Sequence, residues 1–218
     1  IPFPQLPELG FATTPADDPI GGSSDASRKV GFVFRGQYNY ADKYLVEFSG
    51  RYDGSYKFIG NVSGRRWGFF PSVSLGWRMS EEGFFAPLRK AVDNFKLRAS
   101  FGSLGDDNGS AAYAFLSTFT NVSSAPSVVL GGAGQNGIMT SLVANELLTW
   151  ERNHSYNVGF DLAMWNGRLG VEFDAFYNYI FDILGSNSGK PASMGGYYPT
   201  YVNNNAQDVR GIDVRLTH

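Results

Sequence analysis

The stretch FFPSVSLGWRMS, residues 69–80, alternates between apolar and polar side chains. One set of alternate residues is Pro71, Val73, Leu75, Trp77 and Met79, and the set between them is Ser72, Ser74, Gly76, Arg78 and Ser80. A period of two predicts a β-strand whose faces meet different surroundings. A soluble sheet would turn its apolar face to a core, and a membrane barrel would turn it to lipid. This stretch alone does not distinguish the two.

The composition favours an all-β protein with many turns. The 218 residues are 16% aromatic and only 17% charged, and 27 of them are glycine. The net charge of −2 gives no electrostatic argument for binding nucleic acid. Cysteine is absent, which excludes disulfides and thiol chemistry within these residues. No run of 18 apolar residues predicts a transmembrane helix.

The same alternation predicts six further strands. They span residues 28–39, 43–53, 94–102, 149–164, 169–179 and 210–217. Asn166-Gly167 is the strongest two-residue hairpin signal between two of them. Residues 1–27 contain five prolines and no period, so we expect an extracellular loop or an extended segment there.

The links between these strands alternate strictly in length. Short links are predicted at about 40–43, 81–92 and 166–167, and long ones at about 54–68, 103–147 and 185–207. In an up-and-down sheet all short links lie at one end, which is how outer-membrane barrels are built. The strands also run to about 8 to 16 residues, against about 5 to 6 for the mean soluble strand.

Aromatic residues near the strand ends add to this interpretation. Tyr44, Tyr52, Trp77 and Trp150 sit where the interfacial girdles of a membrane barrel would lie. We therefore predict an antiparallel up-and-down transmembrane β-barrel segment over residues 28–218. Single-chain bacterial barrels close with even strand numbers, so seven strands indicate a piece of a larger barrel.

Three motifs in this order resemble those of the SusC/RagA family of TonB-dependent outer-membrane transporters. They read RYDGSYKF at 51–58, RWGFFPSVSLGWRMSEEGFF at 66–85 and NFKLRASFGSLG at 94–105. The stretch LTWERNHSYNVGFDLAMWNGRLGVEFDAFYN at 148–178 and RGIDVRL at 210–216 resemble later family strands.

The resemblance implies a 22-stranded barrel in the bacterial outer membrane, with an N-terminal plug. Such a barrel imports glycans or peptides with a SusD-like surface lipoprotein, and TonB supplies the energy. We expect these residues to be a late barrel segment without the plug domain. TonB would then act through a part of the protein outside them.

Two sets of residues are candidates for function. The first is a charged lumen-facing wall, made of Arg35, Glu47, Arg51, Arg78, Lys96, Arg98, Asp161, Glu172 and Asp174. These charges could touch a plug or a substrate, or simply pair across strands in a hydrated wall. The second is a set of loop aromatics that could stack on sugars or pack on a partner, namely Trp67, Tyr197, Tyr198 and Tyr201.

Catalysis finds no support in the sequence. His154 and His218 stand far apart, and no nucleophile motif, phosphate loop or HExxH occurs. GDDNGS at 105–110 lacks the distal glutamate of a calcium loop, so we expect neither metal nor cofactor.

Two alternatives remain open at this point. One is a small closed outer-membrane barrel, an adhesin, porin or enzyme, with an eighth strand within residues 111–147. The other is a soluble β-sandwich binding module.

Overall fold

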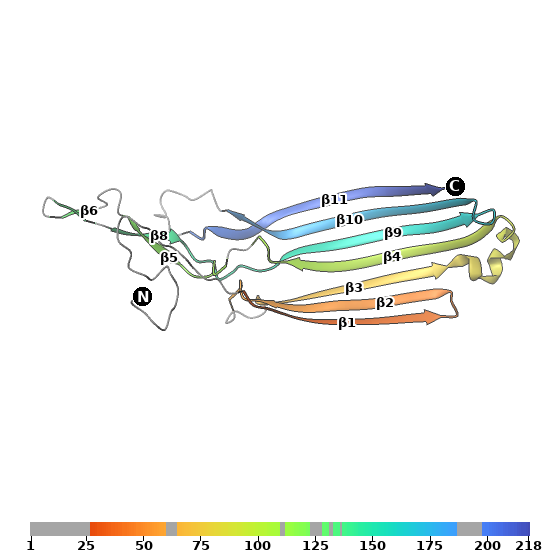
Figure 1. Cartoon of the computed structure of the whole chain (residues 1–218), viewed down its shortest axis with the longest axis horizontal. Coiled ribbons are helices and arrows are strands. Elements are labelled where there is room, and N and C mark those ends of the chain that lie inside the picture. The colour runs from red at the N-terminus through yellow and green to blue at the C-terminus, as the bar shows by residue number, and fades with distance from the viewer. Residues whose placement is uncertain are drawn as a thin grey trace, which may run out of the picture.

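The fold is built on seven long strands (Figure 1). The computed structural model describes residues 27–59, 65–109, 112–122, 128–130, 133–135, 137–186 and 198–218. The long strands are β1 (Lys29–Tyr40), β2 (Tyr44–Ser55), β3 (Trp67–Arg78), β4 (Val92–Asp106), β9 (Glu151–Met164), β10 (Leu169–Ser186) and β11 (Tyr201–Thr217).

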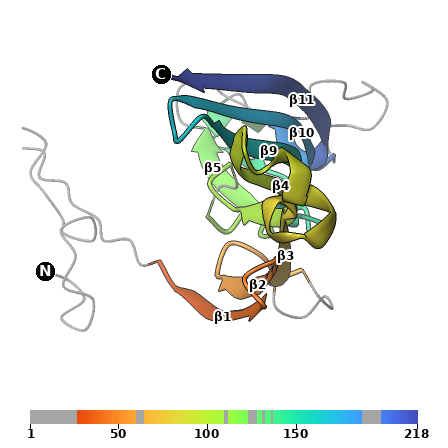
Figure 2. The ribbon, with the colours of Figure 1, turned by 90° about the vertical axis from the view of Figure 1, so that its right-hand side faces the viewer.

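These strands form one antiparallel sheet in the order β1-β2-β3-β4-β9-β10-β11. Each strand therefore pairs with its predecessor in the chain, except that β9 follows β4 after an insertion. Seen end-on, the strands follow an arc from β1 to β11 (Figure 2). An arc of this kind is what a segment of a barrel wall requires, and it confirms the predicted up-and-down arrangement.

The links sort to opposite ends of the sheet, as predicted. The end with residues 41–43, 79–91 and 165–168 is called the turn end, and the other is the loop end. The link 79–91 carries two 3₁₀ helices, η2 (Met79–Glu81) and η3 (Gly83–Leu88). The loop end carries four short strands, β5 (Thr118–Val122), β6 (Val128–Leu130), β7 (Ala133–Gln135) and β8 (Gly137–Leu142).

Both tight turns use left-handed backbone conformations. Asn166 and Gly167 have φ of 56° and 78°, which confirms the hairpin that the Asn-Gly pair predicted. The first turn is less expected, because Ala41 and Asp42 have φ of 52° and 55° without a glycine. The bond from Lys43 N–H to the Tyr40 carbonyl, 3.0 Å, closes that turn.

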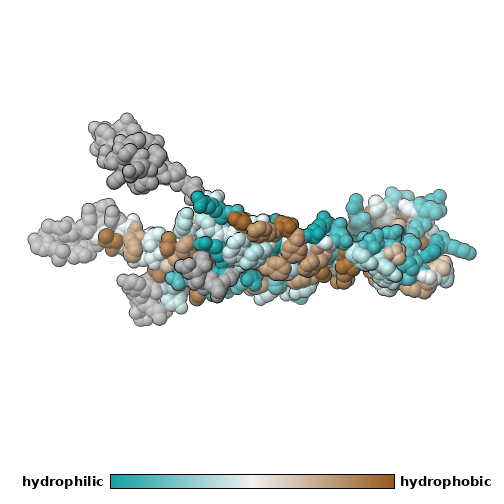
Figure 3. Space-filling model, turned by 90° about the horizontal axis from the view of Figure 1, so that it is seen from below, coloured by the Kyte–Doolittle hydropathy of each residue, from teal (hydrophilic) through white to brown (hydrophobic). Residues whose placement is uncertain are grey.

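The two faces of the sheet differ along its whole width. One face carries an apolar row that crosses six strands in register, made of Tyr44, Trp77, Leu97, Phe160, Phe173 and Val214. Large apolar side chains stay exposed on it, Val158 by 63% and Ile212 by 68%. Figure 3 shows apolar residues gathered over the strands and hydrophilic ones at the turn end. We call this surface the apolar face and its opposite the polar face.

Some boundaries differ from the sequence prediction. β4 reaches Asp106, and β5 to β8 lie within the stretch predicted as a 103–147 loop. β10 and β11 extend to Ser186 and from Tyr201, so the predicted 185–207 loop is shorter. The amide of Asn203 explains part of this, because it donates to the carbonyls of Thr149 and Asp182 at 3.1 and 2.6 Å.

The structure also bears on the two alternatives. The long strands form a single sheet, so the interpretation as a β-sandwich is wrong. In the described ranges, β5 pairs with β8 and β6 with β7, in sheets separate from the long one. The eighth wall strand that a small closed barrel needs within 111–147 is therefore not formed by these four strands.

Among the described residues, no helix combines the length and the apolarity needed to cross a membrane.

Candidate functional site

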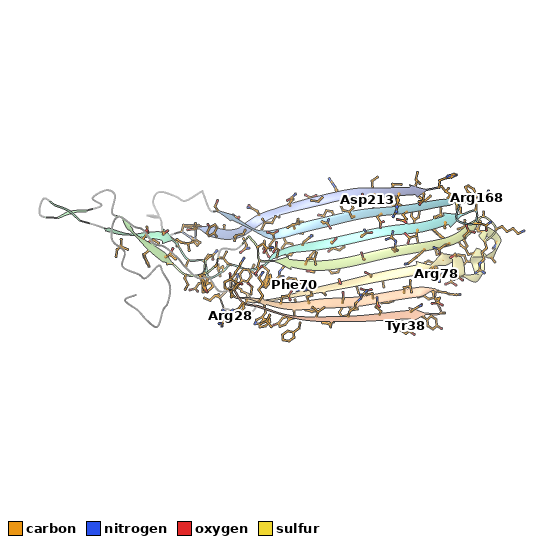
Figure 4. The ribbon with its side chains drawn as sticks, in the orientation of Figure 1. Arg28, Tyr38, Phe70, Arg78, Arg168 and Asp213 are labelled. Carbon is orange, nitrogen blue, oxygen red and sulfur yellow. The ribbon has the colours of Figure 1, made fainter. Side chains whose placement is uncertain are left out.

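Charged side chains fill two neighbouring rows of the polar face, nearer the turn end. The first row crosses five strands in register: Arg78, Lys96, Asp161, Glu172 and Arg215. The second row, in strand order, is Gly76, Arg98, Gly159, Asp174 and Asp213. Figure 4 marks Arg78 and Asp213 on the flanking strands. Four basic and four acidic groups face each other here, so the rows carry no net charge.

Arg98 is the centre of these rows. Its Nη2 lies 2.8 Å from Asp161 and 2.9 Å from Asp174, although β4 and β10 are not neighbours. Gly159 on the strand between them makes this possible, because a Cβ there would lie 2.4 Å from Asp174 Oδ1. The guanidinium is about two-thirds covered, so water screens this triad less than a free surface pair.

Further polar contacts continue along the same face. Arg35 Nη2 and Gln37 Nε2 both donate to Glu47, at 2.8 and 2.7 Å. Arg51 forms an ion pair with Asp53 two residues along its own strand, at 3.0 Å. A groove of about 520 Å³ runs between these groups, with polar lining residues Gln37, Asn39, Glu47, Ser74, Lys96, Arg98, Ser100 and Asn157.

The nine predicted wall residues thus share one face of the sheet. Most of their contacts run between strands, as the interpretation of a hydrated wall with paired charges expected. Arg78 instead contacts the turn end, pairing with Glu81 at 3.4 Å and donating to the Asp42 carbonyl at 3.2 Å. Contact of these residues with a plug or a substrate stays a prediction.

The predicted loop aromatics do not form one group. Trp67 is the first residue of β3, so its assignment to a loop is wrong. Its ring stacks on Tyr52 at 5.0 Å, on the apolar face. Tyr201 is likewise the first residue of β11 and packs against the buried cluster described below. Tyr198 is exposed at the loop end, and Tyr197 lies outside the described residues.

An aromatic cluster at the loop end was not foreseen. Phe58, Phe70 and Trp150 are almost fully buried, with the Trp150 ring 5.2 Å from Phe58 and 5.5 Å from Phe70. Trp150 is buried in this cluster and not exposed on the apolar face, so its predicted place in an interfacial girdle is wrong. Figure 4 marks Phe70 at this end of the sheet. The ring of Phe70 reaches Gly105, where a Cβ would clash with it, and so fills the space between β3 and β4.

Asp107 ties the strands together beside this cluster. Its carboxylate accepts hydrogen bonds from Lys29 at 2.5 Å and Ser55 at 2.6 Å, and Lys57 donates to its backbone carbonyl at 2.8 Å. Burial alone would raise the pKa of Asp107. The hydrogen bonds from Lys29 and Ser55 and the nearby lysine charges outweigh that effect, so its pKa lies below the ordinary value.

Glu82 has the corresponding role at the turn end. Its carboxylate accepts bonds from the Tyr44 hydroxyl at 2.6 Å and from Trp77 Nε1 and Lys43 Nζ, both at 3.2 Å. The bonds from Tyr44, Trp77 and Lys43 lower the pKa of Glu82. Tyr40, Tyr44 and Trp77 stack in sequence across three strands, with centroids 6.4 Å apart at each step.

No three His, Asp or Glu side chains among the described residues lie close enough together to bind a metal ion.

Long strands with one lipid-compatible face, one charged face and links sorted by length define a transmembrane β-barrel wall. The family described as TonB dependent receptor-like, beta-barrel matches residues 6–218. The chain therefore belongs to the TonB-dependent receptor β-barrel family and is a protein of the bacterial outer membrane.

Similar proteins agree with this assignment. TonB-dependent receptor P3 of Formosa agariphila is 33% identical over 155 residues, 71% of this chain. TonB-dependent receptor SusC of Bacteroides thetaiotaomicron is 31% identical over 163 residues, 74% of this chain. The chain spans 15% and 16% of the lengths of these two relatives.

The fold matches a solved transporter. The RagAB peptide importer in its closed-closed state superposes with a TM-score of 0.73 at 21% identity, covering 98% of this chain and 22% of that one. At this identity the likeness shows the fold alone.

Proposed function

We propose that this chain forms part of the wall of an outer-membrane importer that takes up oligosaccharides or peptides by TonB-dependent transport. The observation that carries the proposal is the opposition of the two faces. Unbroken apolar rows cover one side of six strands, and paired charges fill two rows on the other.

The height of the apolar band fits a membrane. Stacked aromatics mark both of its edges, Tyr44 with Trp77 at the turn end and Tyr52 with Trp67 at the loop end. From Tyr44 to Tyr52 a strand rises about 26 Å at roughly 3.3 Å per residue. With the usual strand tilt this gives about 20 Å, close to the roughly 25 Å apolar band of outer-membrane barrels. The apolar face thus meets lipid and the polar face a water-filled lumen.

The sheet needs neighbours on both sides. In the part of the chain that is described, β1 and β11 each pair on one edge only. A free edge in lipid would leave peptide N–H and C=O groups without partners, which costs several kcal/mol for each group. We infer that further strands continue the wall beyond β1 and β11, and that the complete barrel has 22 strands.

The class of substrate rests on the relatives. One relative carries the name SusC, and the RagAB structure is described as a peptide importer. By analogy with these relatives, we propose that the full protein takes a glycan or a peptide as substrate. We further propose that a SusD-like lipoprotein forms a lid at the loop end and that TonB supplies the energy. Tyr198, which is exposed at the loop end, stays our candidate contact for the lid or the substrate, and so does Tyr197, which lies outside the described residues.

Transport is tested with the full-length protein in its source bacterium. We expect deletion of its gene to abolish growth on one defined oligosaccharide or peptide mixture, and re-expression to restore it. A tagged copy is expected to retain a surface lipoprotein through purification from outer membranes. Unchanged uptake of every glycan and peptide offered, with no lipoprotein retained, would overturn the importer assignment.

A further inference from the structure

The link 79–91 lies against the apolar face rather than over the mouth of the lumen. Phe85 in η3 is 5% exposed and stacks on Phe95 at 6.1 Å. Phe95 in turn contacts Phe160, a member of the apolar row. Phe84, the preceding residue, meets the edge of Trp77 at 6.4 Å. Figure 2 shows this link in front, beside the ends of β3 and β4.

Glu82 fixes the link in this position. Its three donors, Lys43, Tyr44 and Trp77, come from the start of β2 and the end of β3. The carboxylate is only 15% exposed, so these bonds are largely shielded from water. The η3 helix is thereby held beside the aromatic residues that mark the membrane edge.

The link nevertheless leaves large apolar side chains uncovered. Phe84 is 61% exposed and Leu88 55%, and Trp165 in the neighbouring turn is 52% exposed. Lys90 follows on the same link and Arg168 on the same turn, both exposed. Figure 4 marks Arg168 at the turn end. Apolar groups with basic groups beside them, next to a lipid-facing wall, match the chemistry of a phospholipid interface.

We propose that Phe84, Leu88 and Trp165 form an interfacial anchor that inserts among the phospholipids of the leaflet at the turn end, with Lys90 and Arg168 on the phosphates. The proposal rests on the membrane orientation given under the proposed function. Lipid is the occupant that the apolar face indicates, because the exposed Phe84 packs against Trp77 and the buried Phe85 holds the link against Phe95, both on that face.

The experiment uses the full-length transporter, otherwise free of cysteine, in phospholipid vesicles. Single variants Phe84→Cys and Leu88→Cys carry a nitroxide label, and accessibility to oxygen and to a water-soluble nickel complex reports depth. Leu75→Cys is the lipid-facing control, because Leu75 is exposed on the apolar face of β3 and lies deeper than Trp77, and Asp42→Cys is the aqueous control on another short turn. Retained heat-modifiable mobility in gels verifies folding for each labelled variant.

We expect the oxygen-to-nickel ratio at residues 84 and 88 to lie between those at residues 42 and 75. A ratio equal to that at Asp42 would overturn the anchor and leave the transporter wall intact. Protection from both reagents would also overturn it, because the patch would then be covered by protein. Nickel access at Leu75 would instead overturn the proposed function itself.

The basic residues are tested in the same system. In vesicles containing phosphatidylglycerol, K90E together with R168E is expected to shift the label at residue 88 towards water. The control R28E reverses an exposed charge at the loop end and is expected to cause no shift. An unchanged depth at residue 88 would overturn the role of Lys90 and Arg168 on the phosphates.

Discussion

The guanidinium of Arg98 on β4 reaches Asp174 on β10, at 2.9 Å, across the intervening strand β9. The contact depends on Gly159, because any side chain at that point of β9 would occupy the space of the Asp174 carboxylate. One glycine thus lets three strands share a single cation, since Arg98 also pairs with Asp161.

Gly159→Ala is expected to destabilise the barrel. The new Cβ would lie 2.4 Å from both Asp174 Oδ1 and the Phe173 carbonyl oxygen, and the carbonyl belongs to backbone that cannot easily move. We expect a loss of roughly 1–3 kcal/mol, the usual cost of overpacking, measured by urea unfolding of the full-length protein in vesicles. Gly102→Ala is the control, because its Cβ would meet Ser72 at an ordinary 3.7 Å. Equal losses in both variants would contradict the account.

Phe69 and Phe70 offer a matched pair with opposite surroundings. Phe70 is 4% exposed within the aromatic cluster, and Phe69 is 53% exposed on the apolar face. Phe70→Ala is expected to cost about 3–5 kcal/mol through the cavity it leaves. Phe69→Ala should cost much less in vesicles, because lipid can fill the vacated space. Unfolding midpoints of the two variants check this, and similar midpoints would show that Phe70 does not join β3 to the loop end.

Glu82 predicts a pH dependence at the turn end. Its hydrogen bonds lower its pKa below the ordinary value of 4.5 in the folded protein. The contribution of Glu82 to the free energy of unfolding is therefore complete above pH 4.5. It is lost as the pH falls through the lowered pKa. Glu82→Gln should remove this part of the pH dependence, seen in thermal midpoints between neutral and acid pH. The neighbouring Glu81→Gln is the control, and an identical pH profile for wild type and Glu82→Gln would refute the role.

The first turn predicts a stabilising substitution. Ala41 has φ of 52°, a conformation that costs an alanine about 1–2 kcal/mol and a glycine almost nothing. Ala41→Gly removes this strain from the folded protein. It also raises the conformational entropy of the unfolded chain, which offsets about 0.4–1 kcal/mol of the stabilisation. The middles of these two ranges differ by about 0.8 kcal/mol, so we expect a net gain of that size, seen as a higher thermal midpoint. Ala99→Gly, within β4, should instead lower the midpoint.

The sequence predicted the wall because period-two alternation and sorted links report directly on a sheet with two environments. For that reason the alternation correctly predicts that Val73, Leu75 and Trp77 lie on the apolar face. The strand register then brings Lys96, Asp161 and Glu172 into one row on the polar face. Sequence reasoning could not foresee that Arg98 would span β9, because this depends on the pairing of Gly159 with both neighbours.

The loop end was harder to predict. Trp67 and Tyr201 stand beside Gly- and Asn-rich segments, and that composition favoured a loop although both residues begin strands. Trp150 continues the alternation of β9 but turns into a cluster with Phe58 and Phe70, which only the three-dimensional structure brings together. Its signal in the sequence is a tryptophan one residue before a strand, which is also where a girdle residue would be expected.

The sorted links have a consequence for how this wall can diverge. β2 and β3 are joined by 11 residues, and β4 and β9 by 44, yet both pairs lie side by side in the sheet. Closing a loop costs only about 0.6 kcal/mol more for each doubling of its length, so this fourfold difference amounts to about 1.2 kcal/mol. The stretch between Ala114 and Leu148 can therefore be lengthened or shortened at little cost in loop-closure entropy, provided that Asp107 and Trp150 keep the two ends of the link packed against the sheet.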